Sequence, residues 1–367
     1  MSIQPKQYRI GCCISAHGYG HATRCMAVLE ALNRRLAVHF EILSTVPQWL
    51  FAETLTAPYT LHALPTDVGL KQHNPLVEDM PATLKALDDF YPLRETCIES
   101  AAAIFAGCDL ILCDIAPLGI AAAKRLGIPS VLLENFTWDW IYQGYNEAWP
   151  GLNRHIAYLA GLFAQADYHI QAIPVCNPHP CDLVVSPIAR PIRNPEAVRQ
   201  ALRPIAGQRL VLVAMGGIGG WTAQVEPLLK RRDLLFLLAG RSRENEFVHN
   251  LRFLGQDDLS WYHPDLVAAA DLVVGKAGYS TVAEVYQAGK PFAYISRSAF
   301  RESGPMCDFI DTHLDSWEIT FEQMGNGEWL NTLPLVPVAP LPAHARKNGA
   351  EQAAAFLAQR IANVSQG

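Results

Sequence analysis

Short apolar runs alternate along the chain with longer stretches of helical periodicity, and this alternation limits the fold more than any other feature of the sequence. Apolar runs of this kind are typical of buried parallel strands, and the stretches between them are typical of crossover helices. We therefore predict an α/β protein with two tandem, doubly wound domains. The predicted strands cover residues 9–15, 38–45, 60–64, 109–114, 130–134, 168–172, 209–215, 234–239, 271–274 and 291–295. The predicted helices cover residues 22–35, 80–106, 117–126, 153–165, 221–230, 264–270, 281–288 and 348–361.

Two proline-rich stretches divide the chain. The first, VVSPIARPIRNPEA at residues 184–197, separates the two alternating series, and its prolines favour an extended connection. The second, at residues 333–344, precedes a last helix whose apolar residues fall on one face and must pack on another element. We place a first domain at 1–187, a second at 188–345 and the last helix within 346–367.

The charge balance excludes several classes of partner. The chain has 29 basic and 35 acidic residues, a formal net charge of -6, and no dense basic run, so we expect no nucleic acid partner. It has no apolar stretch of the roughly 20 residues that span a bilayer. The stretch VPQWLF at 46–51 could touch a membrane surface, but it is too short to indicate one. With no signal-peptide pattern at the start, we expect a cytoplasmic protein.

A glycine-containing loop, SAHGYGHATR at residues 15–24, follows the first predicted strand and leads into a helix. Ligands of open α/β sheets bind at the carboxyl ends of strands, where a helix N-terminus offers N–H groups to an anion. The loop lacks the third glycine of a dinucleotide fingerprint, so a dinucleotide is disfavoured. His21, and as a second choice His17, are candidate catalytic bases, because histidine can accept a hydroxyl proton near neutral pH.

The second half offers two further loops of this kind. One, MGGIGGW at residues 215–221, could bring backbone N–H groups close to a phosphate through Gly216, Gly217, Gly219 and Gly220, or could be only a tight turn. The other, GKAGYSTVAE at residues 275–284, places Gly278, Ser280 and Thr281 at a helix start and Glu284 in the first turn. Glu284 could bind a ribose diol, or could merely complement the helix dipole or close a capping box.

One cysteine and histidine group is ambiguous. Cys176, His179 and Cys181 could be metal ligands, but their spacing fits no common zinc template, and an ordinary proline-rich loop is the alternative. We expect no metal there.

The stretch HPDLVAAADLVVGKAGYSTVAEVYQAGKP at residues 263–291 resembles the nucleotide-sugar half of MurG-like glycosyltransferases, which have the GT-B fold. The first loop and residues 109–142 are similar to the GT-B-like N-terminal region of plant L-arabinokinases and their bacterial stand-alone relatives. The resemblance covers most of residues 9–360 and is weakest over 50–100 and 310–345. It implies two Rossmann-like domains on either side of a cleft, with the last helix packing back on the first domain.

On the donor side, the resemblance implies a site for a nucleotide-diphospho-sugar, and we expect a UDP-linked donor. Glu284 would hold the donor ribose, and Ser280, Thr281 and the loop 216–220 would face the diphosphate. Glu302 is the best local substitute for the amide side chains that the MurG-like family places on the donor sugar. The nucleotide-sugar would be a co-substrate, and no other cofactor is implied.

On the acceptor side, the resemblance gives His21 the role of general base or of support for the transferring sugar. The candidate acceptor contacts follow strand ends of the first domain and are Asp114, Asn135, Trp138 and Asp139. Aromatic rings can stack on sugars, but the same aromatic residues could instead belong to the core.

These features predict a glycosyltransferase that acts with inversion and without a metal on an unknown acceptor hydroxyl. The alternative is a non-catalytic module of the same fold that binds nucleotide-sugars as a sensor or scaffold.

Overall fold

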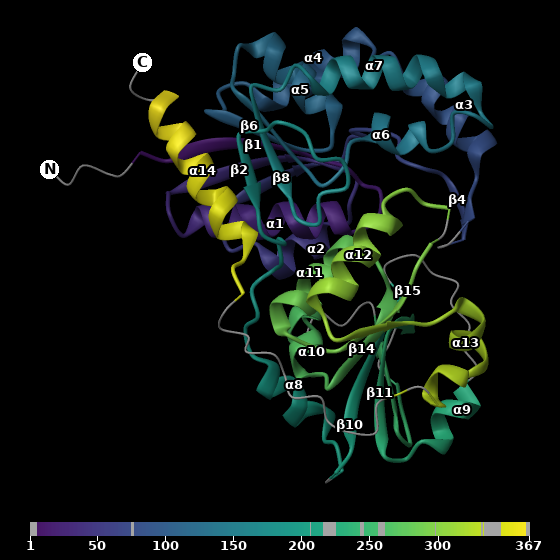
Figure 1. Cartoon of the computed structure of the whole chain (residues 1–367). Coiled ribbons are helices and arrows are strands. Elements are labelled where there is room, and N and C mark those ends of the chain that lie inside the picture. The colour runs from purple at the N-terminus through teal and green to yellow at the C-terminus, as the bar shows by residue number, and fades with distance from the viewer. Residues whose placement is uncertain are drawn as a thin grey trace, which may run out of the picture.

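The structure, a computed structural model, describes residues 6–74, 77–205, 207–215, 225–242, 246–255, 261–297, 299–331, 333 and 346–364. Figure 1 shows two α/β halves, one above the other, that the chain fills in order before its last helix returns to the first half. No helix within these ranges is long and apolar enough to cross a membrane.

The first half is built on a parallel sheet of seven strands in the order β3-β2-β1-β6-β7-β8-β9. The chain leaves β1 toward one edge and returns to β6 on its other side, so the order reverses between these two neighbours. In doubly wound sheets such a reversal opens a crevice at the carboxyl ends of the strands. The strands are β1 Tyr8–Ile14, β2 Val38–Leu43, β3 Tyr59–His62, β6 Leu110–Asp114, β7 Ser130–Glu134, β8 Tyr168–Ala172 and β9 Leu183–Val185.

Helices pack on both faces of this sheet, so its central strands are buried on both sides. In β1, Ile10 and Cys12 belong to one core cluster and Cys13 belongs to the other. The helices are α1 Gly20–Asn33, α2 Gln48–Thr54, α3 Met80–Phe90, α4 Glu95–Phe105, α5 Pro117–Leu126, α6 Trp138–Gln143 and α7 Asn153–Phe163, with a 3-10 turn at Pro150–Leu152. A short antiparallel pair, β4 Gln72–Asn74 and β5 Val77–Glu78, stands apart from the sheet.

The second half repeats the plan with the strand order β12-β13-β11-β10-β14-β15-β16, in which only the β12–β13 pair is antiparallel. Its strands are β10 Arg209–Ala214, β11 Leu234–Ser242, β12 Glu246–Val248, β13 Leu251–Gly255, β14 Leu272–Lys276, β15 Phe292–Ile295 and β16 Ser316–Glu318. Its helices are α8 Pro195–Leu202, α9 Val225–Lys230, α10 His263–Ala269, α11 Tyr279–Ala288, α12 Ser303–His313 and α13 Phe321–Asn326, with a 3-10 turn at Glu328–Asn331.

The last helix, α14 Gly349–Val364, packs beside α1 of the first half (Figure 1). Its buried residues Ala353, Leu357 and Ile361 belong to the same core cluster as those of α1. Gly349 lies against the chain after β9, where a Cβ atom would come within 2.0 Å of the Ser186 carbonyl oxygen. Glycine is therefore required where this helix begins.

The predicted fold class is confirmed, and each predicted strand has a counterpart in the structure. The single helix predicted over residues 80–106 is wrong, because the chain breaks it into α3 and α4. Pro92 lies between them and cannot donate a helical hydrogen bond. The stretch 46–51 enters α2, where Leu50 and Phe51 are buried in the core. The second proline-rich stretch lies almost wholly outside the described residues.

Candidate functional site

A cavity of about 340 Å³ lies between the two halves, where the carboxyl ends of their central strands face each other. Its size is within the range of small-molecule sites. The first half contributes among others His17, His21, Trp49 and Phe136, and the second half contributes among others His263, Lys276, Ser280 and Glu302. Both halves are therefore needed to complete the cavity.

His21, in the first turn of α1, is held by a buried carboxylate. Its Nδ1 atom lies 3.1 Å from Oδ1 of Asp114, the last residue of β6, which is fully buried. His21 lines the cavity, and the contact through Nδ1 leaves Nε2 for a ligand there. A histidine oriented through Nδ1 by a carboxylate is the usual arrangement of a general base.

Arg24, one turn further along α1, shares the same carboxylate. Its Nε and Nη2 atoms donate to the two oxygens of Asp114 at 2.9 and 2.5 Å, and Nη2 also lies 3.1 Å from Nδ1 of His21. Although burial opposes ionisation, the Arg24 charge and the His21 hydrogen bond hold the pKa of Asp114 below its usual value. The Nδ1 atom of His21 can donate to Asp114 or accept from Arg24, but not both. Only the first tautomer leaves Nε2 unprotonated and able to act as a base.

The same guanidinium connects the two halves. Nη1 of Arg24 donates to the Asn135 side chain at 2.6 Å, and Asn135 donates to Oε1 of Glu302 at 2.9 Å. Asn135 follows β7 in the first half, whereas Glu302 caps α12 in the second half and lines the cavity. A residue of the first half therefore positions a carboxylate of the second half.

His17 lines the cavity but is poorly suited to be a base. Its Nδ1 accepts the Leu70 backbone N–H at 3.4 Å, which leaves a hydrogen on Nε2. Burial, together with the nearby His21 and Arg297 side chains, lowers the pKa of His17 to about 3. His17 is thus neutral at physiological pH and can donate a hydrogen bond to a ligand.

The opposite wall is suited to an anion. Gly278 caps the N-terminus of α11, and Gly278, Ser280 and Thr281 all line the cavity. Lys276, the last residue of β14, lines it too, and burial together with the Arg297 guanidinium lowers the pKa of Lys276 to about 8. Helix N–H groups, hydroxyls and a lysine provide the donors that phosphate groups require. The loop 216–220, also predicted to face a phosphate, lies outside the described residues.

Glu284 lies behind this wall. Its Oε1 accepts from Nε of Arg190 at 2.9 Å, and its Oε2 lies 2.6 Å from Nδ1 of His263. Although burial opposes its charge, Arg190 and His263 hold the pKa of Glu284 below its usual value. Arg190 also pairs with Glu53 on α2, which makes a second bridge between the halves. His263, not Glu284, reaches the cavity wall.

The structure corrects the predicted acceptor wall. Asp114, Asn135 and Trp138 are fully buried, and neither they nor Asp139 line the cavity. Asp114 and Asn135 are occupied by Arg24, and Trp138 donates from Nε1 to Oδ2 of Asp67 at 2.6 Å. Asp139 is partly buried in α6. Among the described residues, the aromatic side chains that line the cavity are Tyr19, Trp49, Phe136, Trp261, Tyr279 and Phe300.

Replacing Trp138 with alanine tests this correction. Because the side chain is fully buried and bonded to Asp67, we expect the free energy of unfolding to fall by about 3–5 kcal/mol. Trp49, which is only partly buried on the cavity wall, is the matched control, and Trp49→Ala should cost less. Denaturant unfolding of both variants measures the difference, and an unchanged stability of Trp138→Ala would contradict the assignment to the core.

Comparisons with known proteins agree with this geometry. Residues 222–302 match the glycosyltransferase family 28 C-terminal domain. The chain is 28% identical over 330 residues to the L-arabinokinase of Arabidopsis thaliana, an alignment that covers 86% of this chain and 31% of the plant protein. The chain thus spans about a third of the length of that relative.

Solved structures share the fold over nearly the whole chain. UGT89C1 of Arabidopsis thaliana, complexed with UDP-L-rhamnose, gives a TM-score of 0.63 at 12% identity and covers 98% of this chain and 100% of its own. The glycotransferase of kitacinnamycin gives a TM-score of 0.62 at 15% identity, with the same coverage. The chain therefore has the GT-B fold of these glycosyltransferases, with two doubly wound halves around one cleft and a match to the family 28 C-terminal domain in the second half.

Proposed function

We propose that this chain transfers a sugar from a nucleotide-diphospho-sugar to an acceptor hydroxyl in the cavity between its two halves. The observation that carries the proposal is the arrangement of that cavity: a histidine oriented by a carboxylate on one wall, and a helix N-terminus with a lysine on the other. Transfer of a glycosyl group requires both a base for the acceptor and a cradle for the leaving diphosphate.

The donor would bind to the second half. Its diphosphate would meet the N–H groups at the start of α11, the Ser280 and Thr281 hydroxyls and the Lys276 ammonium. The ribose hydroxyls would meet His263 with Glu284 behind it. A UDP-linked donor is supported by the related fold that was solved with UDP-L-rhamnose. Glu302, fixed by Asn135, would accept hydrogen bonds from the sugar.

The acceptor would bind toward the first half, and the reaction would be a direct displacement with inversion. The acceptor oxygen forms a bond to the anomeric carbon while the bond from that carbon to the diphosphate oxygen breaks. Nε2 of His21 takes the acceptor proton, and the diphosphate leaves with the electron pair of the broken bond. The charges that stabilise the diphosphate in this scheme come from the protein, and no metal takes part in the step.

One observation favours a second candidate function. Arg24 occupies both oxygens of Asp114, which reduces the ability of that carboxylate to hold the proton on Nδ1 of His21. A protein with this arrangement could bind nucleotide-sugars as a sensor or scaffold without turning them over. Turnover by the purified chain separates the two functions.

Replacing His21 with alanine tests the base. Loss of a general base typically costs about 10²–10⁴-fold in rate, so we expect kcat to fall by that factor with little change in donor affinity. The readout is the release of nucleoside diphosphate from a UDP-sugar panel with an acceptor panel. The matched control is His39→Ala, a histidine of β2 that pairs with Glu41 far from the cavity. Equal turnover by the wild type and His21→Ala would overturn the role of His21.

The pKa of Lys276 predicts how UDP affinity depends on pH. The ammonium is charged below about pH 8 and neutral above it, so the affinity for the diphosphate should fall as pH rises. A bound anion raises this pKa, so the decline should appear above pH 8 and reach about tenfold within one to two pH units. Calorimetric titration of UDP between pH 7 and 10 measures it. Lys276→Arg keeps the charge and should bind UDP with little pH dependence, and a wild-type affinity that does not fall would contradict the assignment.

A further inference from the structure

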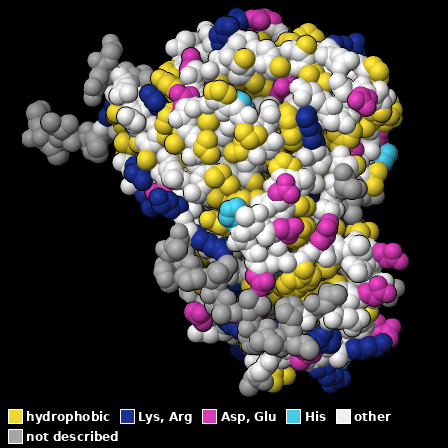
Figure 2. Space-filling view, in the orientation of Figure 1, with side chains coloured by type: hydrophobic (Ala, Val, Ile, Leu, Met, Phe, Trp, Pro, Cys, Tyr) yellow, Lys and Arg dark blue, Asp and Glu magenta, His cyan; other side chains and the backbone are white. Residues whose placement is uncertain are grey.

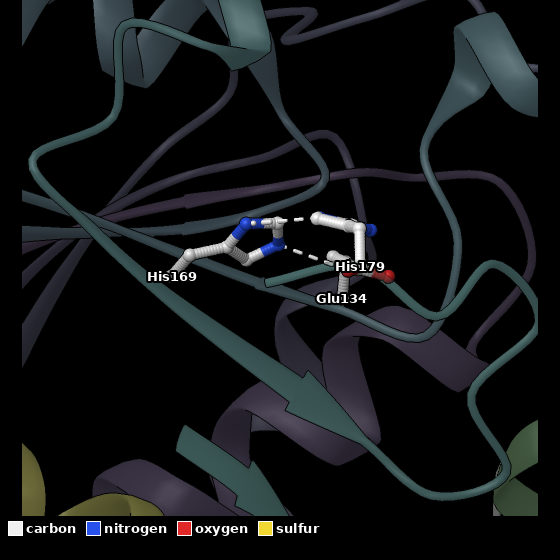
Figure 3. A group of neighbouring side chains, drawn as sticks. All are labelled: Glu134, His169 and His179. Carbon is white, nitrogen blue, oxygen red and sulfur yellow. Dashed lines mark hydrogen bonds and ion pairs between the residues drawn. The ribbon is translucent and has the colours of Figure 1, made fainter. Parts of the chain in front are cut away.

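A second group of ionisable side chains lies outside the cavity. Glu134 ends β7, His169 is in β8, and His179 is in the loop between β8 and β9, and the three side chains lie together (Figure 3). Nε2 of His169 lies 2.9 Å from Oε1 of Glu134, and its Nδ1 lies 3.2 Å from Nε2 of His179. None of the three side chains lines the cavity.

The hydrogen bonds of this group leave two facing nitrogen atoms, Nδ1 of His169 and Nε2 of His179, neither of which carries a hydrogen. Nδ1 of His179 lies 2.8 Å from the Asn177 carbonyl oxygen, which can only accept, so this nitrogen carries a hydrogen. Nε2 of His169 likewise donates to the carboxylate of Glu134. In two neutral rings the facing atoms, Nδ1 of His169 and Nε2 of His179, then both present lone pairs to each other. Two lone pairs that face each other in this way can bind one metal ion.

The neighbouring amide supports this assignment. Nε2 of Gln171 lies within 3.1 Å of Oε1 of Glu134, of the Asn177 carbonyl oxygen and of Nδ1 of His179. Its two hydrogens serve the two oxygen atoms, which leaves the hydrogen between His179 and Asn177 to the imidazole. Gln171 therefore supports both the carboxylate and the loop, as outer-shell residues do around metal ligands.

The distances suit a transition metal. Two nitrogen ligands at about 2.0–2.1 Å from a tetrahedral zinc ion are about 3.3 Å apart, close to the 3.2 Å observed here. Glu134 is 1% exposed, and its second oxygen, Oε2, is buried with no hydrogen-bond partner among the described residues. One ligand atom from each of the three side chains lies within 4.8 Å of the others.

We propose that His169 and His179 bind a divalent transition-metal ion of the zinc class between Nδ1 of His169 and Nε2 of His179, with Glu134 orienting His169 through its other ring nitrogen. Two imidazoles are ligands of a kind that zinc accepts, and water molecules would fill the remaining positions on the exposed side. Of the cysteine and histidine group seen in the sequence, only His179 belongs to this site. Cys176 faces Asn135, and Cys181 faces the Leu183 carbonyl oxygen.

The metal would act on structure, not on transfer. The loop that carries His179 also holds the Ile173 carbonyl oxygen, which accepts from the Tyr279 hydroxyl at 3.2 Å, and the Cys176 N–H, which donates to the Asn135 carbonyl oxygen at 2.7 Å. A metal would therefore fix a loop that touches the second half beside the cavity. This site does not depend on the proposed transfer of a sugar.

Calorimetric titration of Zn²⁺ into the untagged full chain, freed of metal with a chelator, tests the proposal. We expect one tight site per chain and a gain in thermal stability that the chelator reverses. Because even outer-shell substitutions weaken metal sites by 10–100-fold, His179→Ala should weaken binding by more than about 100-fold. Glu134→Gln should weaken binding by about 10–100-fold, and bound Co²⁺ should give a visible absorption band that His179→Ala loses.

A second histidine and carboxylate group supplies the matched control. His39 and His62 flank Glu41, but Arg9 already pairs with that carboxylate. His62→Ala should therefore leave Zn²⁺ affinity unchanged. Zinc that binds the wild type no more tightly than it binds His179→Ala would overturn the proposal and leave a proton shared by the two histidines as the cation between them.

Discussion

The Arg24 guanidinium, 1% exposed, joins the two halves of the protein at the cavity. It donates to Asp114 and Asn135 of the first half, and its Cζ atom lies 4.7 Å from the ring centre of Tyr279 in the second half. Removing one partner of such a buried ion pair typically costs about 3–5 kcal/mol, because the other charge remains buried without compensation. The orientation of His21 through Asp114 depends on the same pair. The candidate base and the contact between the halves therefore rest on one buried interaction.

A second bridge lies on the other side of the cavity. Arg190 joins Glu53 of the first half to Glu284 of the second, and Glu284 holds His263 on the cavity wall. A ligand that contacts His263 thus meets a side chain linked to the boundary between the halves. On the face shown in Figure 2, the visible basic side chains are scattered and not gathered in one patch. The positive charges that concern the proposed function are those of the buried site.

Periodicity predicted the fold well because parallel strands buried on both faces read as apolar runs. Short polar strands such as β16 Ser316–Glu318 carry no such signal and were missed. The sequence also predicted His21 and Ser280 on the cavity wall, since both follow strand ends. It could not separate a core tryptophan such as Trp138 from a wall residue, because both read as aromatic. The partners Arg24 and Asp114 lie 90 residues apart, so only the folded chain shows their pairing.

The central claim is that the cavity binds a nucleotide-sugar through the second half. Its most direct test is the thermal unfolding midpoint of the chain in a panel of nucleotides and nucleotide-sugars, because a ligand of the native state alone stabilises it by about 2.7 kcal/mol at 100 times its Kd. We expect a UDP-sugar to raise the midpoint in the wild type and in the exposed-carboxylate control Glu322→Ala, and to lose this effect in Glu284→Ala. A wild-type midpoint that no nucleotide or nucleotide-sugar changes would contradict the account.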